Sequence, residues 1–210
     1  MDEEFYENLR ERIKIYFENG SGGHGLDHTN RVFKNSLIIS KGENVDLDII
    51  QVAALLHDVA RLKEDEGEVK CHAEEGAKMA RSILIEMEFP QEKIEGVIHA
   101  INVHRYSKNL KPESREAEIL QDADRLDALG ASAIARIMSR AGKASIPIYD
   151  PKIPPKKEYG GAATTAINHF YEKILKIKPE TFKTEKAREI AVERYNFIKE
   201  FVDRFLEESK

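Results

Sequence analysis

The chain has 210 residues, and its 33 lysines and arginines against 38 aspartates and glutamates give a net charge of −5 with the seven histidines neutral. At roughly 150 residues per domain, this length predicts one domain, or one domain with an appendage. The acidic balance disfavours a binder of nucleic-acid polymers or of anionic membranes, while a hydrophobic content of 41% is enough for a buried core.

Two features bear on the cellular location. The single cysteine, Cys71, excludes an intramolecular disulfide and is typical of a reducing compartment. The first ten residues are acidic and carry no apolar run, and the longest apolar run, residues 52–56, is too short to span a bilayer. We therefore expect a cytoplasmic protein with no signal peptide and no membrane contact, and we leave the formation of a homodimer open.

Apolar residues at helical spacing recur along the whole chain, and we find no alternating pattern of useful length that would indicate strands. The predicted helices cover residues 3–18, 27–40, 47–57, 71–88, 91–103, 115–126, 130–140, 163–176 and 183–208. Residues 63–70 are expected to form a charged loop, and residues 141–162 a long loop that contains four prolines. The sequence thus predicts an all-α fold in one domain, residues 1–210, with a core of about 20–140 and C-terminal helices in 163–208.

A histidine and an aspartate follow directly on the most hydrophobic of these helices. Residues 49–56 are apolar on nearly every face, which is typical of a central, buried helix, and His57 and Asp58 come next. Burying two such polar groups is costly unless each finds a partner. A metal ion would satisfy both, because it accepts imidazole nitrogen and carboxylate oxygen as ligands.

Other histidines are predicted to point toward the same core. His28 is spaced four and seven residues from apolar positions on its helix, and His72 and His104 continue the apolar stripes of theirs. His99 is out of phase and is expected to face away. A single inward histidine is usually a satisfied core residue, but four of them, counting His57, favour a functional cluster.

A later segment concentrates negative charge on a helix that must bury one face. Residues 121–127 read QDADRLD, so that Asp122, Asp124 and Asp127 lie within six residues beside apolar neighbours. Carboxylates this close repel one another unless cations lie among them. The pattern is therefore consistent with a bound metal ion.

Four segments, in this order, resemble the HD superfamily of metal-dependent phosphohydrolases, in particular its small stand-alone bacterial and archaeal members. The segments are residues 24–32 (HGLDHTNRV), 53–59 (AALLHDV), 122–130 (DADRLDALG) and 169–173 (HFYEK). The resemblance covers roughly residues 20–205. It implies an HD-domain helical bundle and an enzyme, a metal-dependent phosphohydrolase.

The resemblance also implies the metal ligands. A divalent ion would be held by His28, His57, Asp58 and one aspartate of the later segment, for which we choose Asp124 because the family pattern aligns on it. Asp122 is the alternative ligand, or a residue that orients a ligand or the attacking water. Mixed histidine and carboxylate ligands suit Mn²⁺, Fe²⁺, Co²⁺, Ni²⁺ or Zn²⁺, with Mg²⁺ also compatible.

Catalytic roles are expected for Asp58, for Arg61 and for two further histidines. Asp58 would combine ligation with orientation of the attacking water. His72 and His104 lie where some members of the superfamily hold a second metal, and they alternatively contact the substrate phosphate or protonate a leaving group. The acids of residues 64–66 are candidate proton donors, although such a run is more often solvated.

Several basic groups are candidate contacts for the substrate. Arg61 stands three residues after Asp58, where nucleotidase and alarmone-hydrolase relatives carry an acid, so it is either a phosphate clamp or a surface arginine at a helix end. His24, Arg31 and Lys173 are the further candidates for substrate binding. Arg31 follows His28 by three residues and therefore shares its helical face.

The function expected from this pattern is hydrolysis of a small phosphorylated metabolite, above all a nucleotide. The foremost reaction is the conversion of a nucleoside triphosphate to the monophosphate and pyrophosphate, which the relatives suggest. Dephosphorylation of a nucleoside 5′-monophosphate is the alternative reaction. A non-catalytic module that binds a metal or a nucleotide is the rival from another class.

Overall fold

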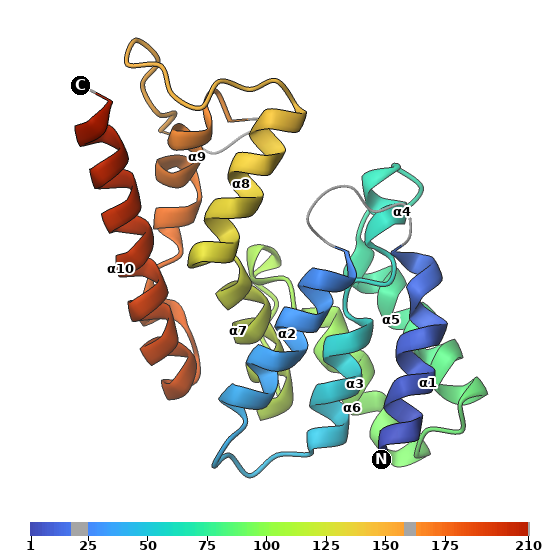
Figure 1. Cartoon of the computed structure of the whole chain (residues 1–210). Helices are drawn as coiled ribbons and strands as arrows, with labels where there is room; N and C mark the ends of the chain where they lie inside the picture. The colour runs from blue at the N-terminus through green and yellow to red at the C-terminus, as the bar shows by residue number, and fades with distance from the viewer. Residues whose placement is uncertain (18–24, 158–162, 210) are drawn as a thin grey trace. The chain divides into compact units, whose positions relative to one another are not determined.

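A computed structural model describes residues 1–17, 25–157 and 163–209, and its ordered elements are helices (Figure 1). The α-helices are α1 (Glu3–Ile13), α2 (Leu26–Ile39), α3 (Leu47–Leu56), α4 (Arg61–Asp65), α5 (His72–Glu86), α6 (Gln91–Val103), α7 (Arg115–Asp127), α8 (Ala131–Lys143), α9 (Ala166–Glu172) and α10 (Glu185–Glu208). Single 3₁₀ turns are η1 (Lys14–Tyr16), η2 (Tyr106–Lys108), η3 (Ile174–Lys176) and η4 (Pro179–Thr181). The described residues contain no strand, which confirms the all-α prediction.

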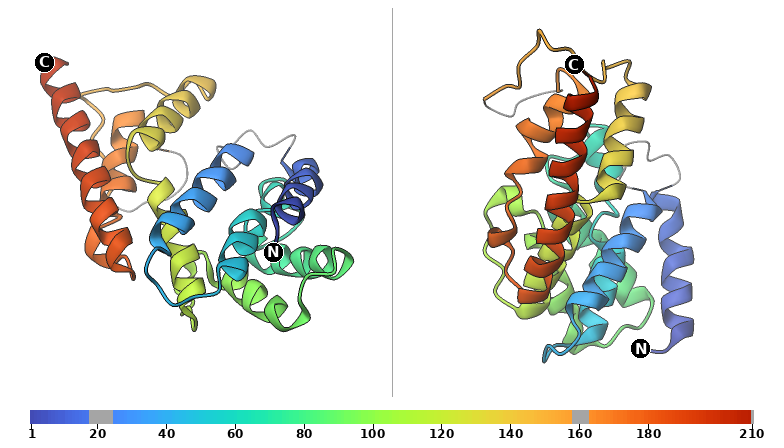
Figure 2. Two further views of the ribbon diagram at one scale, coloured as in Figure 1. Left: turned by 60° about the horizontal axis from the view of Figure 1, so that its bottom comes forward. Right: turned by 60° about the vertical axis from the view of Figure 1, so that its left-hand side comes forward.

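The chain divides into two compact units, Met1–Asp124 and Arg125–Lys210. In the first unit, α3 packs against α2 and α6, and α6 in turn packs against α5 (Figures 1 and 2). All five residues of the run 52–56 are fully buried, as the apolar pattern predicts for a central helix. The side chain of Asp46 caps this helix by accepting hydrogen bonds from the backbone N–H groups of Asp48 and Ile49.

The second unit contains the helices α8, α9 and α10, with η3 and η4 between the last two. The long helix α10 packs against α8 and both 3₁₀ turns, as the right-hand view of Figure 2 shows. Phe170 of α9 and Ile198 of α10 are fully buried and contribute to the core of this unit.

Several boundaries differ from the prediction. The first helix, expected over residues 3–18, ends at Ile13 and is followed by η1. Residues 63–70 are not a loop throughout, because α4 (Arg61–Asp65) forms one helical turn in which the guanidinium of Arg61 pairs with Asp65 four residues on. Helix α8 continues to Lys143 rather than ending at residue 140, because its glycine, Gly142, does not by itself stop a helix. Helix α9 begins only at Ala166, where the Thr165 side chain caps it.

Gly130 lies between α7 and α8 and has a backbone conformation that residues with a side chain rarely adopt. Its φ is +86° and its ψ is −166°, and a Cβ placed there would lie 3.1 Å from Cγ of Arg194. We expect Gly130→Ala to lower the free energy of unfolding by ~1–3 kcal/mol, the usual cost of such backbone strain. Chemical denaturation followed by circular dichroism measures this change.

Gly142 provides the matched control for that substitution. It lies inside α8, and a Cβ there would have no neighbour within 4 Å. Gly142→Ala should leave the stability unchanged or raise it by up to ~1 kcal/mol, because alanine favours the helix. Equal losses in both variants would show that the backbone conformation at Gly130 carries no special cost.

None of the helices in the described part of the chain combines the length and apolar character needed to cross a membrane.

Candidate metal centre

Five polar side chains that the sequence predicts to be functional meet inside the first unit. His28 lies in the first turn of α2, His57 and His104 lie at the C-terminal ends of α3 and α6, and His72 is the first residue of α5. Asp58 lies in the turn that follows α3. Their relative exposures are all 3% or less, which confirms the expected burial of these histidines.

Asp58 stands at the middle of this cluster, and its two carboxylate oxygens face different histidines. Oδ2 lies 3.6 Å from Nε2 of His28 and 3.6 Å from Nε2 of His57. Oδ1 lies 3.2 Å from Nε2 of His72 and 3.8 Å from Nε2 of His104. The donors form two groups that share Asp58, and within each group the ligand atoms lie within 4.8 Å of one another.

The backbone fixes which ring nitrogen carries the proton in two of these histidines. Nδ1 of His57 lies 2.9 Å from the carbonyl oxygen of Ala54, and Nδ1 of His104 lies 2.7 Å from that of Ile101. A carbonyl oxygen only accepts hydrogen bonds, so each Nδ1 must donate. In the neutral rings, Nε2 therefore presents a lone pair to the cluster.

The converging nitrogens make the cluster suitable for cations. Nε2 of His57 lies 3.3 Å from Nε2 of His28, and Nε2 of His72 lies 3.3 Å from Nε2 of His104. Two lone pairs cannot bind one another, so each facing pair needs a proton or a cation between its members. The donor set of imidazole nitrogens and carboxylate oxygens is consistent with a divalent metal ion.

Burial favours the neutral, metal-binding form of two of the imidazoles. Burial lowers the pKa of His104 to about 4, with a further contribution from His57. Burial likewise lowers the pKa of His57, against the opposing charge of Asp58. Neutral imidazole is the form that binds metals, so no proton has to be displaced from these rings near neutral pH.

Asp124 of α7 joins the cluster at its open edge. Its Oδ1 lies 3.3 Å from Nε2 of His28, and its side chain is 27% exposed. Burial alone would raise the pKa of this carboxyl, but the hydrogen bond from His28 and the charges of the neighbouring histidines outweigh it and lower the pKa. Asp122 is fully buried, and Asp127 pairs with Arg136 at 2.9 Å, in the second unit.

Two charged residues of α4 contact the cluster from one side. Oε2 of Glu64 lies 2.5 Å from Nδ1 of His72. Burial would raise the pKa of Glu64, but hydrogen bonds from His72 and the charges of His72 and Arg105 lower it to about 2. The lowered pKa favours the ionised form of Glu64. A proton donor among residues 64–66 stays a prediction. Arg61 bonds to Asp65 at 2.9 Å, and its Nη1 lies 3.5 Å from Nδ1 of His72.

The structure describes two of the three remaining residues that the sequence predicts to bind the substrate. Arg31 is half-buried on α2, one turn after His28. Lys173 follows α9 in the second unit, where it helps to lower the pKa of His169, which burial and neighbouring cations bring to about 4. His24 lies outside the described residues.

Two side chains for which the sequence pattern predicts no role hold α7 in place. Asn35 of α2 donates to the carbonyl oxygen of Ala123 at 3.2 Å, and Gln121 donates to that of Val103 at 2.9 Å. These bonds fix the helix that carries Asp124 to the helices that carry His28 and His104. The sequence does indicate that Asn35 points inward. It follows His28 by seven residues, so both lie on the same face of their helix.

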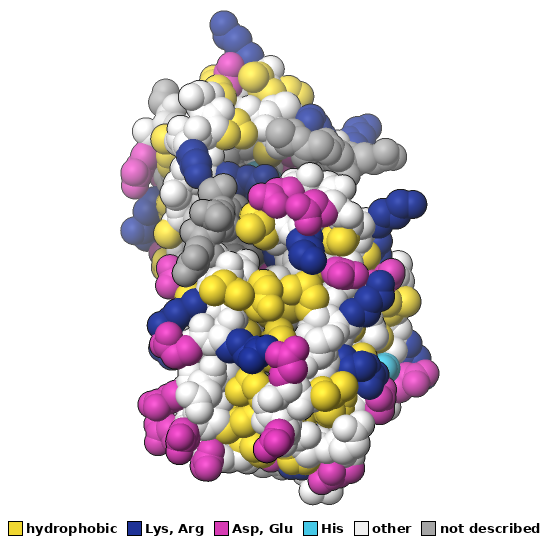
Figure 3. Space-filling model, turned by 90° about the vertical axis from the view of Figure 1, so that its right-hand side faces the viewer, with side chains coloured by type: hydrophobic (Ala, Val, Ile, Leu, Met, Phe, Trp, Pro, Cys, Tyr) yellow, Lys and Arg dark blue, Asp and Glu magenta, His cyan; other side chains and the backbone are white. Residues whose placement is uncertain are grey.

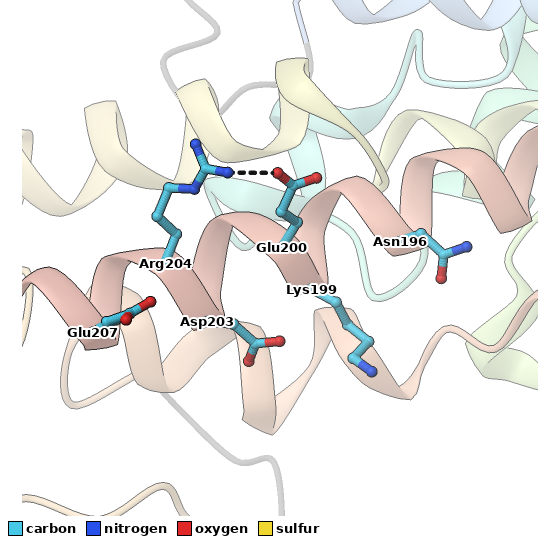
Figure 4. A pocket seen from close by; sticks show the side chains of 6 residues that line it. All are labelled: Asn196, Lys199, Glu200, Asp203, Arg204 and Glu207. Atoms are coloured by element: carbon cyan, nitrogen blue, oxygen red, sulfur yellow. Dashed lines mark hydrogen bonds and ion pairs between the residues drawn. The ribbon is translucent and has the colours of Figure 1, made fainter.

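Within the described part of the chain, the groups of ligand atoms close enough to hold a metal ion are the two that share Asp58. Little histidine is visible on the face drawn in Figure 3, where acidic, basic and apolar side chains are interspersed. A surface hollow of about 420 Å³ lies along α10, lined by the charged and amide residues that Figure 4 labels. Its ion pair between Glu200 and Arg204, at 2.9 Å, is exposed and joins neighbouring turns of one helix.

Comparison with known families settles what kind of protein carries this centre. A family model described as the HD domain matches residues 25–129, the segment that supplies every histidine and aspartate of the cluster. The chain belongs to the HD domain family. The HD pair itself is His57 and Asp58.

Relatives extend the family assignment over nearly the whole chain. The uncharacterized protein YpgQ of Bacillus subtilis is 32% identical over 200 residues, which are 93% of this chain and 89% of that protein. The crystal structure of an HD-superfamily hydrolase from Bacillus thuringiensis is 36% identical, with a TM-score of 0.77 and coverage of 98% and 96% of the two chains. The crystal structure of Bacillus subtilis YpgQ in complex with ADP is 28% identical, with a TM-score of 0.74 and coverage of 99% and 95%. The chain is thus a hydrolase of the HD superfamily.

Proposed function

We propose that this HD-domain hydrolase cleaves a phosphate bond of a nucleotide, using a divalent cation held by His28, His57, Asp58 and Asp124. The observation that carries the proposal is the convergence of imidazole Nε2 atoms on the buried carboxylate of Asp58, at 3.6 Å for both His28 and His57. Such a cation supplies Lewis-acid polarisation of a phosphoryl oxygen, worth several kcal/mol of stabilisation in the transition state.

The residues themselves define how a substrate approaches. Asp124, 27% exposed, is the solvent-accessible member of the proposed ligand set, while Asp58 and the two histidines are almost fully buried. We therefore expect a phosphate group of the substrate to reach the cation past Asp124. Asp58 orients the water molecule that attacks this phosphate. Arg31 and Lys173 remain our candidates for binding the phosphates, as does His24. Arg61 is a weaker candidate, because its guanidinium is engaged by Asp65.

We assign His72 and His104, with Oδ1 of Asp58, to a second cation site. The support for this choice over substrate contact is that the three donors form a compact group and the two Nε2 atoms face each other at 3.3 Å. Titration with Mn²⁺ under calorimetry should give two bound ions in the wild type and one in His104→Ala. A single ion in both proteins would instead leave His72 and His104 as substrate contacts.

A nucleotide is the substrate class that the relatives favour, because Bacillus subtilis YpgQ has been crystallised with ADP. Within that class we propose cleavage of a nucleoside triphosphate to the monophosphate and pyrophosphate. Release of phosphate from a nucleoside 5′-monophosphate is the alternative reaction. Manganese as the metal and a cytoplasmic location also remain proposals, the latter based on the single cysteine, Cys71.

The test is a turnover assay in Mn²⁺ with nucleoside tri-, di- and monophosphates that measures phosphate and pyrophosphate separately. We expect pyrophosphate from triphosphates in the wild type and none from His57→Ala. Phosphate from monophosphates would select the alternative reaction. If the metal-loaded wild type releases neither product from any nucleotide, the proposed function is wrong and a binding module is favoured.

His99→Ala is the matched control for the loss of a histidine. His99 lies on α6, five residues before His104, and its Nε2 accepts a hydrogen bond from the backbone N–H of Glu113 at 3.0 Å. It takes no part in the cluster around Asp58. Its replacement should leave both turnover and metal content at the level of the wild type.

A further inference from the structure

The carboxylate of Glu64 joins α4, α5 and Arg105, the second residue after α6. Its Oε2 lies 2.7 Å from the backbone nitrogen of His72 and 2.5 Å from ring atom Nδ1 of the same residue. Nη1 of Arg105 donates to both carboxylate oxygens, at 3.0 and 3.2 Å. The side chain is 21% exposed, so these contacts are only partly shielded from water.

One of these contacts has a purely structural explanation. Cys71 is the N-cap residue of α5, but it makes no side-chain capping bond. Glu64, supplied by the preceding helix, accepts the backbone N–H of His72 in its place. A carboxylate at this position satisfies an otherwise unbonded donor and interacts favourably with the helix dipole. Capping alone, however, does not require contact with the imidazole ring.

The contact with the ring determines which nitrogen of His72 carries the proton. Oε2 of Glu64 already accepts from the backbone N–H of His72 and from Arg105, so this oxygen is an acceptor and the Nδ1 atom at 2.5 Å must donate to it. Arg61 also approaches Nδ1, and its N–H would require a lone pair there, but at 3.5 Å that contact lies at the limit of a hydrogen bond. The contact with Glu64 is therefore decisive.

We propose that Glu64 is a positioning residue that holds a proton on Nδ1 of His72 and so leaves Nε2, which faces Asp58, as the ring atom that binds a cation. Nε2 of His72 lies 3.2 Å from Oδ1 of Asp58 and 3.3 Å from Nε2 of His104. Arg105 binds both oxygens of this carboxylate and so helps to keep it in place. His57 and His104 reach the same proton arrangement through backbone carbonyl oxygens, whereas His72 depends on a side chain.

For cation binding, this inference rests on the second site that we propose for Asp58, His72 and His104. Carboxylates that hold the outer nitrogen of a ligand histidine typically contribute ~10–100-fold to metal affinity. Removing Glu64 should weaken the binding of the second Mn²⁺ ion by that factor. The affinity for the first ion should stay unchanged, because none of the hydrogen bonds described for His28 and His57 joins them to Glu64.

The experiment combines two measurements on full-length wild type, Glu64→Ala and Glu64→Gln. Long-range ¹H–¹⁵N spectra of the metal-free proteins at pH 8 report which ring nitrogen of His72 is protonated. Calorimetric titration with Mn²⁺ reports the affinity of each ion. We expect a proton on Nδ1 of His72 in the wild type, a loss of that proton in favour of Nε2–H in Glu64→Ala, and an intermediate result in Glu64→Gln, whose amide oxygen still accepts one bond.

Asp46→Ala is the matched control for lost helix capping. Asp46 caps α3 through the backbone N–H groups of Asp48 and Ile49, and its removal should destabilise the protein without changing the His72 spectrum. A wild type in which Nδ1 of His72 carries no proton, or an unchanged spectrum in Glu64→Ala, would overturn the role of Glu64. If the wild type binds one Mn²⁺ ion only, the second site falls, while the spectra still decide the role of Glu64.

Discussion

Asp58→Asn is expected to abolish both metal binding and hydrolysis while leaving the protein folded. The carboxylate faces one pair of histidines with Oδ2 and the other pair with Oδ1, so its loss removes a ligand from both proposed cation sites. Asparagine retains the shape of the side chain but not its charge. A loss of ~4 kcal/mol of transition-state stabilisation corresponds to a fall in kcat/KM of about 1000-fold, which we take as the minimum effect.

The measurements are kcat/KM with a nucleoside triphosphate and the metal content of the purified protein. Asp48→Asn is the matched control, because Asp48 is also a bonded aspartate of the first unit, at 2.6 Å from Lys93 and 2.8 Å from the hydroxyl of Tyr6. It should lose stability but keep its metal and its activity. A fully active Asp58→Asn variant would show that the reaction does not depend on this centre.

The second large effect is expected from Asp124→Ala. Its carboxylate is 3.3 Å from Nε2 of His28, on the accessible edge of the cluster. We expect Mn²⁺ binding at the first site to weaken by more than ~100-fold, beyond the range of a residue that merely supports a ligand. Calorimetric titration with Mn²⁺ and the metal content after purification both measure the effect.

Asp122→Ala separates the two candidate aspartates. Asp122 is fully buried on the same helix, two residues away, and we expect its loss to leave most of the bound metal in place. Any weakening should stay within ~10–100-fold, as for a residue that orients a ligand. If Asp122→Ala loses its bound metal and Asp124→Ala keeps it, the ligand assignment must be reversed.

The sequence was sufficient to predict the buried side chains and the helices that carry them. Helical spacing alone indicated that His28, His72 and His104 face inward, because each falls on an apolar stripe. The apolar run of α3 likewise indicated its central place. These predictions depend on local periodicity, which a single sequence displays directly.

The contacts between helices were beyond the reach of that reasoning. The ion pair of Glu64 with Arg105 joins residues 41 positions apart, and no local pattern marks either partner. Helical spacing indicates that Asp122 and Asp124 point in different directions, about 200° apart at 100° per residue, but not which of them faces His28. That choice depends on how α7 packs against α2, where Asn35 binds the carbonyl oxygen of Ala123.

The position of His57 and His104 at helix ends has an electrostatic consequence. Each is the C-cap residue of its helix, α3 or α6, and each ring is bonded to a carbonyl oxygen three residues earlier. The C-terminus of a helix carries about half a negative elementary charge from its aligned peptide dipoles. One such end therefore lies at each proposed cation site, which attracts positive charge there without requiring a further buried carboxylate.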